Sequence, residues 1–390
     1  MSDITPEGSA ADESSEERRF EELGRLAGAA VRRPVPPRLV DEAVAAGQRQ
    51  RRRRSIVTGT IIVVAVGALV AAITSLSSRP TVPVDSVSPT APATTSTIPP
   101  VEGPLMVGES QVGAGYGTYV YDAKGQKIRR LDDPSGSALK PDPSPDGKLV
   151  VFTNSDDTLW LVGIDGANAH QLLACDKTCD ALDNAAFSPD GRRIAFTAAV
   201  AAAGPPASTT IRVLDLDTMV TTDVVTGKYP ALVDVPRWSP DGARLVVGLD
   251  YFDDHGDEIG SSIAVVAVSG GAVTPLVDQA VFAYAPDWNH VTGEIVYSTE
   301  TREDRAGGIA SGDTWDLHGI QADGSAGRTI TSVAAGQRLK MPYWTLDGKS
   351  LLAVFYKDGI YSEVRIDATT GALTEISTGV GTHVRQVPET

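Results

Sequence analysis

Residues 185–198 read AAFSPDGRRIAFTA, and this stretch recurs in related form on both sides of itself. The related stretches are PDPSPDGKLVVFTN at residues 141–154 and PRWSPDGARLVVGLD at residues 236–250. In each one, proline presets φ at the second position of a turn, aspartate can bond the nearby backbone, and glycine accepts a positive φ. The sequence therefore predicts three tight turns, formed by Ser144, Asp146, Gly147, Ser188, Asp190, Gly191, Ser239, Asp241 and Gly242.

The turns belong to a longer repeat. Runs of β-forming residues begin every 44 to 56 residues, at Leu105, Leu149, Ile194, Leu245, Ile295 and Leu351. Weaker copies of the turn precede the last two runs, and a second and a third strand follow each run. Most turns come directly after an aromatic residue, which we expect to fill the core (Phe187, Trp238, Trp288 and Trp344). A strand repeat of this length is typical of radial β architectures.

The repeats resemble the WD40-like repeats of TolB-type β-propellers, and the resemblance covers residues 105–390. It implies an all-β fold, a six-bladed β-propeller with four-stranded blades. The first unit lacks an inner strand ahead of Leu105, whereas HVRQVP at residues 383–388 lies where the next unit would begin. We therefore expect the C-terminal strand to complete the first blade, which closes the ring and hides the sheet edges.

A single membrane segment is expected ahead of the repeats. Residues 56–76 read IVTGTIIVVAVGALVAAITSL, 21 residues without a charge, and a helix of this length spans the ~30 Å hydrocarbon core. Arginines at positions 49 and 51–54 precede it, and positive charge stays in the cytoplasm. Because the apolar run and its leader are too long for a cleaved signal peptide, we predict a single-pass signal anchor with a cytoplasmic N-terminus and an extracytoplasmic propeller.

The segments around the predicted membrane helix differ in composition. Residues 1–55 begin with a stretch rich in Ser, Glu and Asp, so we expect a largely disordered cytoplasmic tail with short helices. Its apolar positions leave two interpretations open, a solvated stem or a docking helix for a cytoplasmic partner. Residues 77–104 are dominated by Pro, Thr and Ser, which predicts an extended stalk that separates the propeller from the bilayer.

Net charge argues against nucleic acid as a partner. The chain has a formal charge of −16, yet residues 1–55 hold 11 basic and 10 acidic side chains. The acidic excess therefore lies in the C-terminal part, whose surface repels phosphate groups. Soluble proteins, peptides or glycans fit such a surface better.

Candidate site residues lie between the predicted strands. The short turns share one face of a propeller, so we expect binding on the other face, where longer loops occur near Gly204, Asp250 and Thr299. An acidic cluster there could offer oxygen ligands to calcium, although its spacing departs from the EF-hand pattern and a solvated loop is the alternative. The cluster comprises Asp250, Asp253, Asp254, Asp257 and Glu258. In an oxidising compartment Cys175 and Cys179 could form a disulfide, and two separate thiols are the alternative.

No catalytic motif is present, since the sequence lacks a G-x-S-x-G elbow, an H-E-x-x-H pair and a phosphate loop. We therefore expect no enzymatic activity and no cofactor apart from the calcium considered above. The expected function is a membrane-tethered module that binds an extracytoplasmic protein, peptide or glycan as a sensor or regulatory scaffold. The alternative is a propeller enzyme, a metal-dependent hydrolase or lyase with carboxylates at the mouth of the central channel.

Overall fold

The structure consists almost entirely of β-strands. The computed structural model describes residues 104–112, 115–131, 138–201, 206–301, 314–378 and 383–388, which all belong to one compact unit, 93–390. Within these ranges the one helix is a short 3-10 turn, η1 (Gln279–Val281), and no helix is long and apolar enough to cross a bilayer. The predicted tail, the membrane segment at 56–76 and all of the stalk but its last residue lie outside the described residues.

Two of the sheets have four antiparallel strands each, in the orders β24-β1-β2-β3 and β4-β5-β6-β7. The strands of the first are β1 (Met106–Val112), β2 (Gly115–Tyr121), β3 (Lys127–Arg130) and β24 (Arg385–Gln386). Those of the second are β4 (Ala138–Pro143), β5 (Leu149–Asn154), β6 (Leu159–Gly163) and β7 (His170–Leu173). The predicted all-β class is confirmed.

Two larger sheets each consist of two four-stranded antiparallel parts. A single residue pair joins the parts, Lys228 with Ala231 in one sheet and Trp315 with Arg338 in the other. The strands of the first sheet are β8 (Ala181–Phe187), β9 (Arg193–Val200), β10 (Ser208–Asp215), β11 (Val220–Lys228), β12 (Ala231–Trp238), β13 (Arg244–Phe252), β14 (Glu258–Ala267) and β15 (Thr274–Pro275). Those of the second are β16 (Ala283–Trp288), β17 (Ile295–Thr301), β18 (Thr314–Ile320), β19 (Arg328–Thr331), β20 (Arg338–Trp344), β21 (Ser350–Lys357), β22 (Ile360–Asp367) and β23 (Leu373–Thr378). Repeated four-stranded units of this kind are those expected of a β-propeller.

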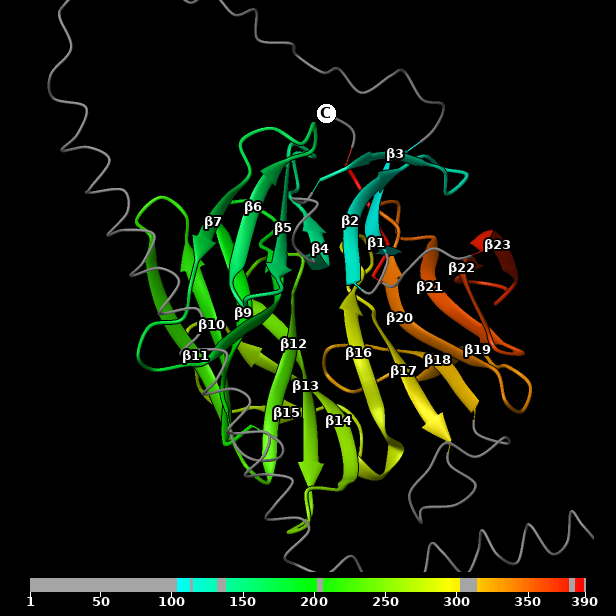
Figure 1. Cartoon of the computed structure of the whole chain (residues 1–390). Helices are drawn as coiled ribbons and strands as arrows, with labels where there is room; N and C mark the ends of the chain where they lie inside the picture. The colour runs from blue at the N-terminus through cyan, green and yellow to red at the C-terminus, as the bar shows by residue number, and fades with distance from the viewer. Residues whose placement is uncertain are drawn as a thin grey trace, which may run out of the picture. The chain divides into compact units, whose positions relative to one another are not determined.

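The two ends of the domain meet in one sheet. β24 pairs antiparallel with β1, so that Gln386 lies opposite Met106 and Arg385 opposite Val107. In Figure 1 the sheets follow one another in chain order around the domain, which brings the red C-terminal strand beside the cyan β1. The C-terminal strand therefore completes the first sheet, as the sequence predicted, and covers the free edge of β1.

The predicted turns connect the first and second strands of their sheets. After β4, the Gly147 amide donates to the Ser144 carbonyl at 2.9 Å, and φ at the glycine is 68°. The Ser144 hydroxyl donates to the Asp146 carboxylate and accepts from the Leu149 amide. The turns after β8 and β12 repeat these contacts, and Thr345 replaces the serine after β20. Each motif is therefore a turn stabilised by its own side chains.

Antiparallel order gives the domain two faces. We call the side that holds the turns at 144–147, 188–191 and 239–242 the turn face, and the side with the hairpin at 253–257 the loop face. The prediction of a long loop from Asp250 was wrong, because Asp250 lies within β13 and β14 already begins at Glu258. The pairing of β13 with β14 extends to Phe252 and Glu258. In the tight turn that remains, the Asp253 carboxylate accepts hydrogen bonds from two backbone amides.

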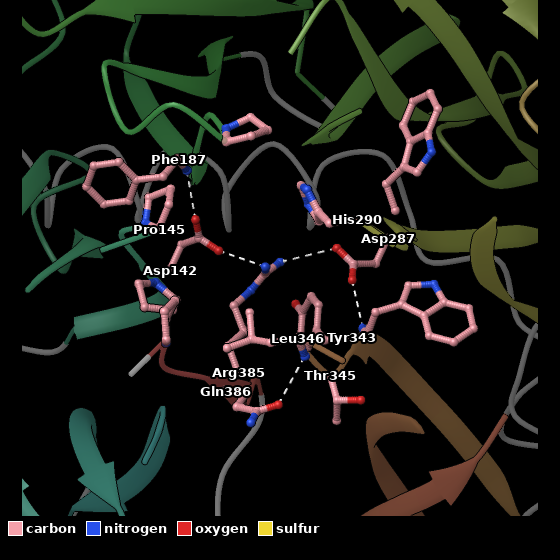
Figure 2. Close-up of a pocket in the computed structure, with 15 residues that line it drawn as sticks. Asp142, Pro145, Phe187, Asp287, His290, Tyr343, Thr345, Leu346, Arg385 and Gln386 are labelled. Atoms are coloured by element: carbon pink, nitrogen blue, oxygen red, sulfur yellow. Dashed lines mark hydrogen bonds and ion pairs between the residues drawn. The ribbon is translucent and has the colours of Figure 1, made fainter. Parts of the chain in front are cut away.

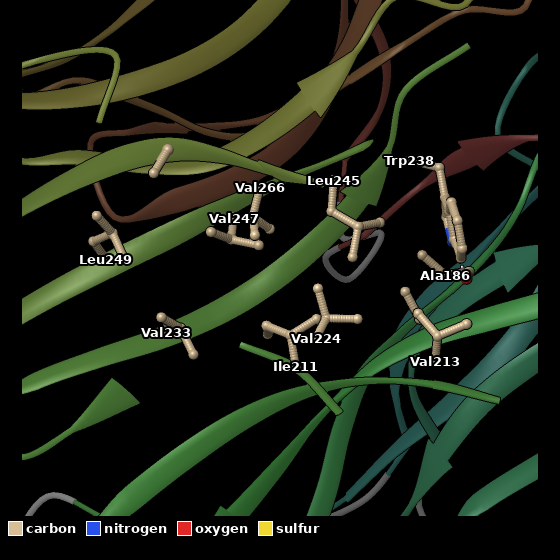
Figure 3. Packing of buried hydrophobic residues seen from close by; sticks show 12 residues of the cluster. Ala186, Ile211, Val213, Val224, Val233, Trp238, Leu245, Val247, Leu249 and Val266 are labelled. Carbon is tan, nitrogen blue, oxygen red and sulfur yellow. Dashed lines mark hydrogen bonds between the residues drawn. The ribbon is translucent and has the colours of Figure 1, made fainter. Parts of the chain in front are cut away.

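Neighbouring four-stranded parts pack through buried apolar side chains. Figure 3 shows one such cluster, which includes Val233 from β12 and Val247 from β13, with Trp238 at one end. Trp238 is 2% exposed, and its Nε1 donates to the Ala186 carbonyl at 3.0 Å. This side chain therefore links two adjacent four-stranded parts. The aromatic residues that precede the turns are all buried, as predicted (Phe187, Trp238, Trp288 and Trp344).

Candidate functional site

A bulge recurs in the first strand of each four-stranded unit from β4 onward. The pairing register shifts at the same place in β4, β8, β12, β16 and β20. The bulges contain residues with left-handed φ values between 48° and 54°, namely Lys140, Asn184, Val235, Ala285 and Met341. His383, ahead of β24, has a φ of 63°. A bulge re-aims the side chains that follow it, and here the residues two positions later are Asp142, Ala186, Arg237, Asp287, Tyr343 and Arg385.

Five of these residues come together from different strands, and we call Asp142, Arg237, Asp287, Tyr343 and Arg385 the ionic cluster. Arg385 lies between the two carboxylates, as Figure 2 shows. Its Nη1 is 2.7 Å from Asp142 Oδ1, and its Nη2 is 3.8 Å from Asp287 Oδ1. Its guanidinium carbon is 4.0 Å from the centre of the Tyr343 ring. Arg237 approaches Asp287 to 4.0 Å, so oppositely charged side chains alternate around the cluster.

The carboxylates of the ionic cluster are also held by the backbone. Asp142 Oδ2 accepts from the Phe187 amide at 2.7 Å, and Asp287 Oδ2 accepts from the Trp344 amide at 2.8 Å. Burial opposes the charge on Arg385, but the two carboxylates outweigh burial and raise the pKa of Arg385. Each carboxylate of the cluster is therefore both ion-paired and hydrogen-bonded, which is the arrangement that a buried carboxylate requires.

A cavity of about 380 Å³, the turn-face pocket, has four members of the ionic cluster as its floor, namely Asp142, Asp287, Tyr343 and Arg385. The other lining residues come mainly from the turns and are largely apolar: Pro143, Pro145, Phe187, Pro189, Trp288, His290, Trp344, Thr345, Leu346, Gln386 and Pro388. Leu346 is 47% exposed at the edge of this pocket. The pocket therefore combines an apolar rim with a charged floor.

A second cavity, the loop-face pocket, has a volume of about 340 Å³. Bulge residues Val235, Ala285 and Met341 line it, so the bulges separate it from the ionic cluster. The other lining residues are Asp234, Gly248, Asp250, Phe252, Glu258, Ala283, Tyr284, Ser298, Trp315 and Lys340.

The carboxylates of the loop-face pocket differ in their partners. Asp234 Oδ1 accepts from Asn184 Nδ2 at 2.8 Å, and Glu258 accepts from the Tyr284 hydroxyl at 2.6 Å. Among the described residues, none hydrogen-bonds or pairs with the Asp250 carboxylate. Burial, followed by the charges of Asp234 and Glu258, raises the pKa of Asp250 to about 7. Asp250 is therefore a half-buried carboxyl group without a partner among the described residues.

Aromatic side chains form another part of the loop-face pocket. The rings of Tyr284 and Trp315 stack with centroids 5.0 Å apart and an angle of 17° between their planes. The Lys340 ammonium lies 4.1 Å from the centre of the Trp315 ring, a cation–π contact. Burial, and then the charge of Arg338, lower the pKa of Lys340.

The structure separates the five acidic residues predicted as calcium ligands. Asp250 and Glu258 line the loop-face pocket, Asp253 stabilises the hairpin turn, and Asp254 and Asp257 are exposed. In the part of the chain that the structure describes, no three His, Cys, Asp or Glu side chains are grouped as metal ligands. Calcium binding by this segment stays a prediction.

The two cysteines lie on the connection between β7 and β8. Cys175 and Cys179 form a disulfide with their Cα atoms 5.4 Å apart, which is the pairing that the sequence suggested. Both sulfurs pack against the buried cluster that contains Leu182. The disulfide therefore stabilises a connection on the loop face and leaves no thiol for chemistry.

Sequence reasoning missed the turn-face pocket, because it placed binding on the loop face alone. A signal was available in the residue two positions before each turn, which is Asp142, Ala186, Arg237, Asp287 or Tyr343. Opposite charges in this one repeat position are unusual for a buried strand. They indicate side chains that meet one another across the repeats.

Comparison with known proteins supports the fold. No protein family and no curated protein matches the chain in sequence. TolB from Acinetobacter baumannii is 15% identical with a TM-score of 0.53, over 73% of this chain and 67% of that one. An Agrobacterium tumefaciens protein assigned as TolB is 16% identical with a TM-score of 0.53, over 73% and 98%. Hydrazine synthase from Kuenenia stuttgartiensis is 13% identical with a TM-score of 0.54, over 74% and 46%. The chain thus has a TolB-like β-propeller fold.

Proposed function

We propose that this chain is a six-bladed β-propeller that binds an extracytoplasmic protein or peptide in the turn-face pocket. The apolar rim around the ionic cluster carries the proposal. Prolines from two successive turns, Pro145 and Pro189, line the same pocket as the exposed Leu346. Interfaces place apolar contacts around a few oriented polar groups, whereas a glycan would need more hydrogen-bonding groups than this rim offers.

The charges of the floor support binding over catalysis. A hydrolase or lyase needs a carboxylate that is free to accept or deliver a proton, or free to bind a metal. Here each carboxylate of the ionic cluster accepts from a backbone amide and faces Arg385. These contacts suit a rigid surface that positions a ligand. Within the turn-face pocket, the enzyme alternative has no comparable observation in its favour.

The rest of the chain completes the proposal. Residues 56–76 would hold the protein in a cell membrane, with residues 1–55 in the cytoplasm and residues 77–104 as a stalk. In this arrangement the turn-face pocket meets its partner outside the cytoplasm, and the tail can report occupancy to a cytoplasmic partner. The tail would then act as the regulatory part of a sensor or scaffold.

Site-specific photocrosslinking in native cells tests the proposed face. A photoreactive residue at Leu346 lies at the pocket, and one at Met219 is a matched control, since Met219 is 52% exposed on a turn between outer strands. We expect one discrete crosslinked partner from position 346 alone. Equal labelling from both positions would contradict the assignment.

A further inference from the structure

The loop-face pocket has features of a second ligand site, separate from the site proposed above. Its volume of about 340 Å³ lies within the range of small-molecule cavities. Most of its walls are apolar or aromatic, while the Asp250 carboxylate has no partner among the described residues. A polar group in such a place is costly unless something satisfies it. The cavity therefore has room for a ligand and one group that lacks a counterpart.

The charges around Asp250 favour a positive counterpart. Asp234 from β12 and Glu258 from β14 both act on Asp250, and with burial they raise its pKa to about 7. The Tyr284 hydroxyl is already engaged by Glu258. Lys340, the cation in the pocket, lies over Trp315 and forms no ion pair with Asp250. A cation bound at Asp250 would relieve the repulsion among the three carboxylates.

A metal ion fits this place less well than an organic cation. Calcium takes six to eight oxygen ligands and prefers several carboxylates. Asp234 Oδ1 accepts from Asn184 and from the Thr197 hydroxyl, and Glu258 Oε1 accepts from Tyr284. Among these three carboxylates, Asp250 alone has no hydrogen-bond donor in the described part of the chain. One carboxylate beside aromatic and aliphatic walls is the usual arrangement for recognising an ammonium group on an apolar body.

We propose that the loop-face pocket binds an amphipathic primary amine. The ammonium group donates to the Asp250 carboxylate, and the hydrocarbon part packs against Phe252, Tyr284 and Met341. The charge of Lys340 repels a second cation from the Trp315 end, so it orients the ligand with its ammonium group toward Asp250.

Calorimetric titration of the full-length chain in detergent tests the proposal. The probes are phenethylammonium, its neutral analogue 2-phenylethanol and the anion 3-phenylpropionate. We expect the amine to bind about tenfold more tightly than the alcohol, and its affinity to rise between pH 6 and pH 8 as Asp250 ionises. Asp250→Asn should remove this preference. Asp254→Asn, which makes the same change on the exposed hairpin, should preserve it.

The variant Lys340→Met distinguishes a pocket that recognises amines from one that recognises carboxylic acids. If Lys340 only repels a cation, the variant binds the amine at least as tightly as the wild type. If 3-phenylpropionate binds best and Lys340→Met abolishes its binding, the site recognises an acid and the proposal fails. Equal binding of amine and alcohol, or equal losses in both Asp→Asn variants, would overturn it too. Photocrosslinking at Leu346 reports on the other face, so failure here leaves the proposed function standing.

Discussion

The turn-face and loop-face pockets lie on opposite sides of the same bulges, yet their charges are arranged differently. On the turn face, Arg385 lies between Asp142 and Asp287, and backbone amides hold both carboxylates. On the loop face, Asp250 has no such partner among the described residues, and Lys340 lies over an aromatic ring instead. Paired charges make the first pocket a rigid surface. The unpaired carboxylate of Asp250 makes the charge of the second pocket depend on pH and on any ligand that binds there.

The largest expected effect comes from breaking the pairs of the ionic cluster. Arg385→Met leaves the buried carboxylate of Asp142 without its cation and that of Asp287 with Arg237 alone, and breaking a buried pair in this way costs about 3–5 kcal/mol. We expect a fall of that size in the free energy of unfolding, measured by denaturant titration. Arg192→Met is the control, because its pair with Asp217 lies at the surface and should contribute little. Similar losses in both variants would contradict a special role for the cluster.

The next effect concerns the isolated carboxylate of the loop face. Because the pKa of Asp250 is raised to about 7, the folded state keeps a proton between about pH 4 and pH 7 that the unfolded chain has released. Stability should therefore fall as the pH rises through this range and level off above it. Asp250→Asn should remove this contribution, on the order of 3 kcal/mol at pH 8 relative to pH 4. Thermal unfolding of both proteins across this range measures the difference, and parallel curves would refute it.

The smallest effect concerns the bulge that separates the pockets. Val235 has a φ of 49°, a left-handed conformation that a β-branched residue adopts at a cost. Val235→Gly should relieve this strain and stabilise the protein by about 1 kcal/mol. Val233→Gly, two residues earlier at a buried position in the same strand, should destabilise it by more than about 2 kcal/mol. Loss of stability in both variants would mean that the Val235 side chain stabilises more through packing than it costs in strain.

Much of the fold could be predicted because its signals are local. Each Ser-Pro-Asp-Gly motif contains the groups that form its own turn, and the aromatic residue before it identifies the buried end of the first strand. The closing strand at 383–388 was also predictable, because the first unit lacked a strand that the other units have. These features depend on neighbours in the chain, or on a gap in a regular repeat.

The two pockets could not be predicted in the same way. The bulge residues include Lys140, Val235 and Met341, which share no chemistry, so no local pattern indicates their left-handed backbone. Without the bulges, the inward positions of Asp142 and Arg385 cannot be assigned. The acidic residues from Asp250 to Glu258 favour a loop in the sequence, because polar residues are common in loops. Asp250 and Glu258 instead belong to paired strands, and their side chains line a cavity.

The pairing of β24 with β1 has a consequence for biosynthesis. A ribosome makes β1 before all the other strands and Arg385 after β23, so the first sheet cannot be complete until the intervening strands have been made. Arg385 is also the central residue of the turn-face pocket. Any chain that stops before residue 385 lacks both the closing strand and the cation that the pocket is built around. Ligand binding on the turn face, as proposed, would therefore distinguish chains that include Arg385 from chains that stop before it.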